Sequence, residues 1–261
     1  MKISNKTKLS VDYGSIPHNR KIAKPNEDKL IVDEENKIFI LLDGITRPHS
    51  EYEMRPNKSY AKDYSEEFAD SAYTYIVTHM DELEPEELLT NAVKTANNKL
   101  CRMKAKIGEC EFYPGTLGII SIIKDGRLHY VCVGDSLAVL IRKTSRLVFG
   151  SELPLEAVDL HNVSKAIRYE TYCNHPENHL SYTIFNGDDV VMDGLEYSFI
   201  DLCESDVLFL GSDGIGSCLK YEKIQDLKMM TVEEIFKLSE KYDIPPYAEY
   251  ADDKTLIKLT F

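Results

Sequence analysis

The sequence predicts an α+β fold in which two mainly antiparallel sheets are flanked by helices. Short apolar runs joined by tight polar turns dominate the chain, and this pattern indicates hairpins. Helical patterns occur in blocks and alternate only weakly with strands, so parallel β-α-β units are not favoured. The chain has 261 residues, of which 43% are hydrophobic, which suffices for a sizeable core. We therefore expect a single domain over residues 1–261.

The N-terminal half contains a predicted hairpin followed by two helices. Apolar runs at residues 28–32 and 37–42 flank an acidic turn. Residues 57–80 carry apolar side chains at a spacing of four, which predicts one helix. A second helix begins near Pro85 and ends before Gly108, because proline suits a first helical turn and glycine a helix end.

The C-terminal half predicts mainly strands. The Asp125-Gly126 pair is a strong hairpin signal between two apolar runs. A capping-box sequence at Thr231 starts a helix that continues to about residue 242. Residues 150–195 show the weakest periodicity, and we expect a flap subdomain there. The predicted strands of this half are 117–123, 128–133, 136–142, 147–149, 197–201, 207–210 and 255–259.

Composition narrows the possible partners and the compartment. The formal net charge of −13 disfavours nucleic acid and anionic membranes, because an acidic surface repels phosphate. No apolar run approaches the ~20 residues that span a bilayer, and residues 1–6 lead into a polar stretch, unlike a signal peptide. The six cysteines show no C-x-x-C spacing, which favours reduced thiols. We therefore expect a cytoplasmic protein that binds neither nucleic acid nor membrane.

Short acidic clusters recur along the whole chain, and most of them lie at the end of an apolar run. Carboxylates at the ends of buried strands repel one another unless a cation lies between them, and hard divalent cations prefer oxygen ligands. The clusters therefore predict a Mg²⁺ or Mn²⁺ site assembled from distant parts of the chain. They are Asn26-Glu27-Asp28, Asp43-Gly44, Ser212-Asp213-Gly214 and Asp252-Asp253-Lys254-Thr255.

Two further motifs accompany the acidic clusters, namely Gly115-Thr116-Leu117-Gly118 and Val133-Gly134-Asp135-Ser136. In order, and over nearly the whole chain, the set resembles the motifs of the metal-dependent serine/threonine protein phosphatases, the type 2C or PPM family. The resemblance implies a four-layer α-β-β-α sandwich with a two-metal centre in the cleft between the sheets. It also implies a phosphoprotein substrate, and hence a role opposite to that of a kinase.

The resemblance implies two Mg²⁺ or Mn²⁺ ions, with a third in some members of the family. Asp43 would bridge both metals, and Asp28 would orient metal-bound water. Asp135 would help to hold the third ion, although a Gly-Asp-Ser sequence is also an ordinary hairpin turn. The remaining ligands would be the Glu27 carboxylate and the Gly44 carbonyl at one metal and Asp213 and Asp252 at the other.

Two departures from the family motifs concern the substrate more than the metals. Ala23 occupies the position of an arginine that grips phosphate in the family. The neighbouring Lys24 or the downstream Arg47 could replace it, although lysine lacks the bidentate grip of arginine. His49 could be the general acid for the leaving group or an ordinary surface histidine.

The predicted function is metal-dependent hydrolysis of phosphoserine or phosphothreonine on proteins, by a water that two metals activate. Two alternatives remain open. One is a phosphatase for a small phosphorylated metabolite, and the other is a regulatory or binding module with little catalysis. We expect a monomer. His161, His175 and His179 have no common zinc spacing, so we expect them to be solvated.

Overall fold

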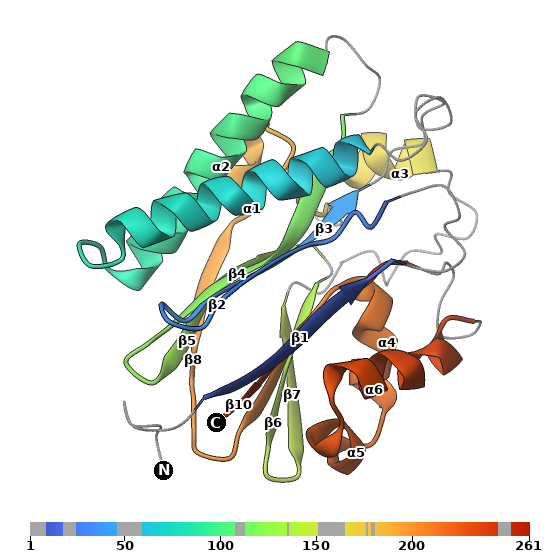
Figure 1. The fold of residues 1–261 in the computed structure, drawn as a ribbon. Helices are drawn as coiled ribbons and strands as arrows, with labels where there is room; N and C mark the ends of the chain where they lie inside the picture. The colour runs from blue at the N-terminus through green and yellow to red at the C-terminus, as the bar shows by residue number, and fades with distance from the viewer. Residues whose placement is uncertain are drawn as a thin grey trace.

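Two antiparallel sheets stacked face to face form the centre of the molecule, with helices outside each sheet (Figure 1). The architecture is a four-layer α-β-β-α sandwich, which confirms the predicted fold class. The computed structural model describes residues 9–17, 25–45, 59–107, 113–134, 136–150, 165–175, 177–178, 181–244 and 252–261.

The first sheet has the strand order β2-β3-β4-β5-β8 and carries helices α1 and α2 on its outer face (Figure 1). All of its predicted strands and both predicted helices are present, with ends that differ by a few residues. Their bounds are β2 Lys29–Asp33, β3 Ile38–Ile45, β4 Gly115–Lys124, β5 Arg127–Val133, β8 Glu196–Asp201, α1 Tyr60–His79 and α2 Pro85–Ile107.

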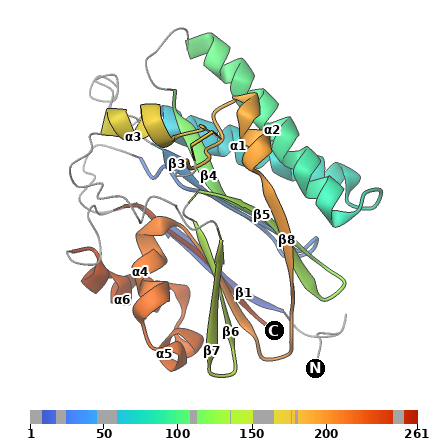
Figure 2. The ribbon, with the colours of Figure 1, turned by 180° about the vertical axis from the view of Figure 1, so that it is seen from behind.

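The second sheet has the order β1-β10-β9-β6-β7, and helices α4, α5 and α6 cover its outer face, as Figure 2 shows from behind. Thr231 and Glu234 form the predicted capping box at the start of α6. The bounds are β1 Ser10–Ile16, β6 Leu137–Arg142, β7 Ser145–Gly150, β9 Val207–Gly211, β10 Lys254–Thr260, α4 Asp213–Tyr221, α5 Ile224–Met229 and α6 Val232–Ser239, with the 3₁₀ turn η5 Glu240–Tyr242.

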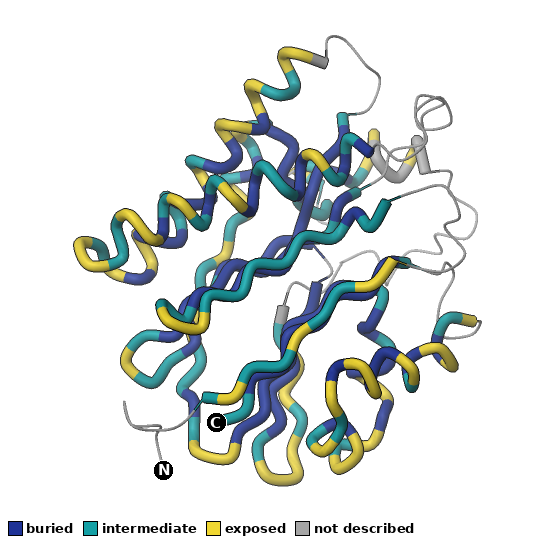
Figure 3. Tube along the Cα trace, viewed as in Figure 1, coloured by how far each residue is buried: buried dark blue, intermediate teal, exposed yellow. Residues whose placement is uncertain are grey.

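The central strands β3, β4, β6 and β9 are buried on both faces, which explains their nearly continuous apolar runs (Figure 3). In β3, Phe39 and Leu41 lie in the core between the sheets. Ile40 and Leu42 lie in the core beneath α1 and α2. Because successive side chains of a strand alternate between its faces, Asp43 follows Leu41 on the side that faces the other sheet.

The Asp125-Gly126 hairpin has the predicted turn chemistry. The φ angles are 52° at Asp125 and 71° at Gly126. Positive φ at both central residues is the requirement of a type I′ turn, whose twist matches that of the flanking strands. This turn fixes the register of β4 and β5, in which Gly118 pairs with Val133.

Five elements of the described residues are not predicted by the sequence: β1, α4, α5, α3 (Lys165–Tyr172) and the 3₁₀ helix η4 (Asp189–Gly194). The edge strand β1 is only partly buried and lacks an apolar run. Helix α4 begins at Asp213, directly after β9, where the Ser-Asp-Gly sequence was interpreted as the end of a strand. Its apolar residues Ile215, Cys218 and Leu219 have helical spacing, but the helix is too short for that pattern to stand out.

The predicted flap near residues 150–195 lies partly outside the described residues and stays a prediction. Within it, Ile184, Phe185 and Val191 are buried in the core beneath α1 and α2. Asn97 of α2 also accepts a hydrogen bond from the backbone N–H of Gly187 at 2.9 Å and donates one to the carbonyl of Asp188 at 2.9 Å. The segment around η4 (Asp189–Gly194) is therefore anchored to α2.

No disulfide joins any two of the five described cysteines, Cys101, Cys132, Cys173, Cys203 and Cys218. Within the same part of the chain, no helix has both the length and the apolar character needed to cross a membrane.

The buried His129 makes stability depend on pH. Its side chain is 7% exposed, and its Nδ1 lies 2.7 Å from the Tyr197 hydroxyl. Burial lowers the pKa of His129 below its ordinary value of 6.5, and the charge of Arg127 adds to this effect. Above pH 6.5 the imidazole is neutral in both states. Below it the unfolded chain binds a proton that the folded chain resists, so stability falls.

We therefore expect the free energy of unfolding to decrease by up to about 1.4 kcal/mol per pH unit below the unfolded pKa because of this one group. Urea unfolding of the wild type and of His129→Phe between pH 5 and 7.5 measures the slope. The variant should have the shallower slope. Equal slopes in the two proteins would contradict the assignment.

Candidate metal centre

Asp43 and Gly44 are among the last three residues of β3, at one end of the space between the sheets. The strand continues through both residues to Ile45, so the pair is part of the ladder and not a turn. A Cβ atom on Gly44 would lie 2.6 Å from the carbonyl oxygen of Glu27 and 2.9 Å from that of Ala61. Only glycine permits this approach, which brings the end of β3 against the segment that carries Glu27.

Glu27 connects three layers of the fold. Its backbone N–H donates to Oδ2 of Asp253 at 2.9 Å, which links it to the start of β10. Its carboxylate accepts a hydrogen bond from the hydroxyl of Ser59, the N-cap of α1. Its carbonyl accepts one from Ser65 at 2.7 Å. The side chain is 1% exposed, and these contacts fix its position beside Gly44.

Asp213 and Asp252 approach the same place from the second sheet. Asp213 is the first residue of α4, where the helix dipole favours a negative charge. A Cβ on Gly214 would lie 2.1 Å from the carbonyl oxygen of Asp253, so α4 begins directly against the Asp252-Asp253 backbone. Oδ1 of Asp252 accepts from the backbone N–H of Asp253 at 2.8 Å.

A chain of hydrogen bonds crosses from β1 through β10 to Asp28. The amide of Asn26 donates to the Ser15 hydroxyl at 2.7 Å, and the Ser15 and Thr255 hydroxyls lie 2.6 Å apart. The Thr255 hydroxyl in turn donates to Oδ2 of Asp28 at 2.6 Å. Since that donation uses the proton of Thr255, Ser15 donates to Thr255. All four side chains are thereby held in one orientation.

Asp28 is buried close to two other carboxylates, those of Asp253 and Asp252. Burial raises the pKa of Asp28 to about 7, opposed by the hydrogen bond from Thr255 and reinforced by the charges of Asp253 and Asp252. An ordinary aspartate has a pKa of 3.8. Burial is the main cause of the raised pKa, and a cation between these groups would relieve the smaller part that comes from repulsion by Asp253 and Asp252.

The structure thus brings together Glu27, Asp28, Asp43, Gly44, Asp213 and Asp252 at one end of the space between the sheets, through the contacts of Gly44, Asp253 and Gly214. The donor types, carboxylates and a backbone carbonyl, fit Mg²⁺ or Mn²⁺. Among the described residues, no three acidic, histidine or cysteine side chains form a ready-made chelating cluster. The contacts thus bring together the segments that carry the candidate ligands, and the described side chains form no such cluster.

The other predicted site residues, Lys24, Arg47, His49 and Asp135, lie outside the described residues, as do His161 and His179. Their roles stay predictions. His175 is described, and its Nδ1 lies 3.0 Å from Oε1 of the exposed Glu177.

Sequence reasoning missed the residues that hold the ligands in place, above all Ser15, Ser59 and Ser65. Ser59 had a usable signal, since a serine before a helical pattern is a preferred N-cap. Ser15 lies on the unpredicted strand β1, and its role depends on the pairing of Ser15 with Thr255 across β1 and β10. No local pattern discloses that pairing.

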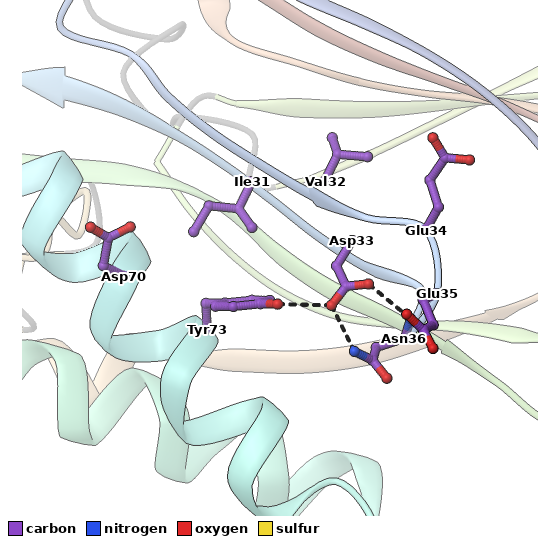
Figure 4. A pocket seen from close by; sticks show the side chains of 8 residues that line it. All are labelled: Ile31, Val32, Asp33, Glu34, Glu35, Asn36, Asp70 and Tyr73. Carbon is purple, nitrogen blue, oxygen red and sulfur yellow. Dashed lines mark hydrogen bonds between the residues drawn. The ribbon is translucent and has the colours of Figure 1, made fainter.

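A hollow of about 710 Å³ lies at the opposite end of β2, between the β2–β3 turn and α1 (Figure 4). Tyr73 points toward Asp33 and donates to it at 2.9 Å. Although burial acts to raise it, the pKa of Asp33 is lowered by hydrogen bonds from Asn36 and Tyr73. Hydrogen bonds from the turn and from α1 thus account for the position of Asp33, and the hollow is separate from the candidate metal centre.

The hydroxyl of Thr255 is the part of the Asp28 network that is easiest to test. Thr255→Val keeps the shape of the side chain and removes its hydrogen bonds to Asp28 and Ser15. Loss of a partner in the outer shell of a metal site typically costs 10–100-fold in metal affinity or activity, so we expect Mn²⁺ to bind about 10-fold more weakly. Titration calorimetry measures this. Thr260→Val, at the far end of β10, is the matched control and should bind as the wild type does.

Known structures share this fold at low sequence identity. The serine/threonine phosphatase PstP of Mycobacterium tuberculosis is 18% identical, with a TM-score of 0.65 over 97% of this chain and 98% of that one. PppA of Pseudomonas aeruginosa, a regulatory component of the T6SS, is 13% identical, with a TM-score of 0.67 over 97% and 98%. A catalytic domain of PstP in complex with 2 manganese ions is 17% identical, with a TM-score of 0.63 over 97% and 99%.

No protein-family model and no curated protein sequence matches this chain. The likeness to solved structures establishes that the chain has the fold of the serine/threonine phosphatases, as the motif resemblance predicted.

Proposed function

We propose that this protein is a Mn²⁺- or Mg²⁺-dependent phosphatase of the type 2C family that hydrolyses phosphoserine or phosphothreonine on proteins. One observation carries the proposal: the acidic ends of β3, β10 and α4 and the Glu27-Asp28 segment meet at one end of the space between the sheets. They do so in a fold shared with known serine/threonine phosphatases. The two manganese ions in the PstP catalytic domain support the proposal that this protein also binds divalent cations.

The residues of the chain have distinct tasks in this proposal. Two divalent cations, when bound, supply a water of lowered pKa that can attack phosphorus in line with the leaving group. Glu27, Asp43, the Gly44 carbonyl, Asp213 and Asp252 hold the cations, and Asp135 adds a ligand for a third. The apposition of Gly44 and Glu27 holds one ligand group together, and that of Gly214 and Asp253 holds the other. The hydrogen bond from Glu27 to Asp253 joins the two groups.

The proton and phosphate tasks fall to other side chains. Asp28 orients the attacking water, and the hydrogen bond from Thr255 fixes which of its oxygens faces that water. Lys24 or Arg47 binds the phosphoryl oxygens and stabilises the charge that develops on them. His49 donates a proton to the leaving serine alkoxide, which is otherwise a poor leaving group.

A small phosphorylated metabolite is the second candidate substrate. The observation that favours it is Ala23 at the position of the family's phosphate-gripping arginine, together with the unusual sequence of residues 45–49. A regulatory module without catalysis is the third reading, and the set of mutually repelling carboxylates argues against it. We further propose a monomeric, cytoplasmic, single-domain protein with a flap near residues 150–195.

Hydrolysis of p-nitrophenyl phosphate with Mn²⁺, with Mg²⁺ and with EDTA tests the proposal. Turnover should depend on the metal and stop in EDTA. A panel of phosphopeptides and phosphorylated metabolites then separates the two substrate classes. Folded protein that hydrolyses none of these compounds with added metal would favour the regulatory module.

A further inference from the structure

Lys254 is a buried cation directly behind the candidate ligand Asp252. It is the first residue of β10 and is 3% exposed. Its ammonium donates to the hydroxyl of Ser239 at 2.7 Å and lies 2.8 Å from the carboxylate of Asp243. A buried ammonium needs such partners, because an unpaired charge is costly away from water.

The side chain of Lys254 points away from the metal centre, toward the helical layer. Leu256, two residues along β10, lies in the core beneath α4 and α6. Ile257 lies in the core between the sheets. Because side chains alternate along a strand, Lys254 shares the helix side with Leu256, whereas Asp253 and Thr255 face the other sheet.

The ion pair joins Asp243 and Lys254, and Asp252 lies between these two residues in the sequence. Asp243 follows η5 and is separated from Lys254 by 11 positions in the sequence. Asp252 is the second-last residue of the connection between them, so the pair fixes both ends of the connection that carries Asp252. Ser239, the last residue of α6, adds a second contact on the same side.

The opposite side of the same backbone is held independently. Oδ2 of Asp253 accepts from the N–H of Glu27 at 2.9 Å, and its carbonyl lies against Gly214. Contacts on both sides thus hold the backbone at residues 253–254: those of Asp253 in the space between the sheets and those of Lys254 in the helical layer. Removing the contacts on one side leaves rotation about this backbone less restricted.

We propose that the Lys254–Asp243 ion pair is a positioning element that sets the carboxylate of Asp252 for metal binding. The proposal rests on the proposed function, since it assigns the pair to the same metal centre. Lys254 does not touch the metals. It acts through the backbone, as groups that orient metal ligands do, and loss of such groups typically costs 10–100-fold in metal affinity.

The chain offers a matched control in Lys258. It lies on the same side of the same strand, is 8% exposed, and donates to the carbonyls of Lys228 at 2.8 Å and Met230 at 2.5 Å. It lies farther along β10 from Asp252. Lys254→Met and Lys258→Met each remove one buried ammonium and keep most of the side-chain volume, so both lose stability, but only the first should loosen Asp252.

The experiment is calorimetric titration of metal-free protein with Mn²⁺, with urea unfolding of each variant to confirm that it is folded. Lys254→Met should weaken Mn²⁺ binding by about 10-fold or more, and Lys258→Met should leave the dissociation constant unchanged. Lys254→Arg, which keeps a charge for Asp243, should recover part of the affinity. Asp243→Asn should weaken binding alone but add little to Lys254→Met, because both changes break one interaction.

Unchanged Mn²⁺ binding in folded Lys254→Met, or equal weakening in both Met variants, would overturn the positioning role while leaving the proposed function intact. A wild-type chain that binds no Mn²⁺ would overturn both. Should Lys254→Met not fold, Asp243→Asn carries the test, and unchanged binding in that variant overturns the role.

Discussion

The Asp43→Asn variant should lose the metal-dependent hydrolysis of p-nitrophenyl phosphate by at least about 100-fold, since even groups that merely orient ligands cost 10–100-fold. Asparagine keeps the size of the side chain and removes the charge that Asp43 would contribute as the proposed bridging ligand. Because Asp43 lies in β3 on the side facing the second sheet, the backbone ladder around it does not depend on that charge.

Asp125→Asn is the matched control for Asp43→Asn. Asp125 occupies the β4–β5 turn at a φ of 52°, a conformation that asparagine adopts well. This variant should retain the activity of the wild type. Full activity of folded Asp43→Asn would contradict the role of Asp43. A loss of activity in Asp125→Asn would show that removing any carboxylate lowers activity, and the result for Asp43 would then not be specific.

The Arg142→Met variant should lose about 3 kcal/mol of unfolding free energy, because it leaves a buried carboxylate without its cation. Asp206 is 1% exposed, and both of its oxygens accept from Arg142, at 2.7 Å from Nη2 and 3.0 Å from Nε. Arg142 also donates to the carbonyl of Asp201 at 2.7 Å. The pair therefore joins β6 to the connection between β8 and β9.

Arg127→Met is the control for Arg142→Met. The Arg127–Asp201 pair has a similar distance of 2.9 Å, but its side chains are 41% and 44% exposed. Water screens an exposed pair, so the expected cost is about 1 kcal/mol or less. Urea unfolding at neutral pH compares the two. Equal losses in both variants would show that burial of Asp206 does not set the strength of its pair.

The parts of the fold that could be predicted are those with a strong local cause. The run at residues 38–42 is apolar throughout because both faces of β3 are buried, and it marks that strand clearly. The Asp125-Gly126 turn and the Thr231 capping box have chemistry that only a few local conformations use. The likeness to phosphatase structures confirms the fold that these signals and the motif order predicted.

The parts that could not be predicted depend on contacts between distant segments. Ser15 matters because β1 pairs with β10, and Lys254 matters because it meets Asp243 behind Asp252. In the sequence Lys254 is one more charged residue in an acidic cluster, with nothing to show that it is buried. The candidate ligand residues follow from motif order and stay predictions, whereas the residues that hold them in place could be found only in the structure.

Calorimetric titration of metal-free wild-type protein with Mn²⁺, alongside Asp213→Asn, tests the central claim most directly. The claim is that acidic groups from both sheets form one divalent-cation centre. We expect saturable binding in the wild type and a loss of affinity of at least about 10-fold in Asp213→Asn. No saturable binding by folded wild-type protein would contradict the claim, as would identical binding by the variant.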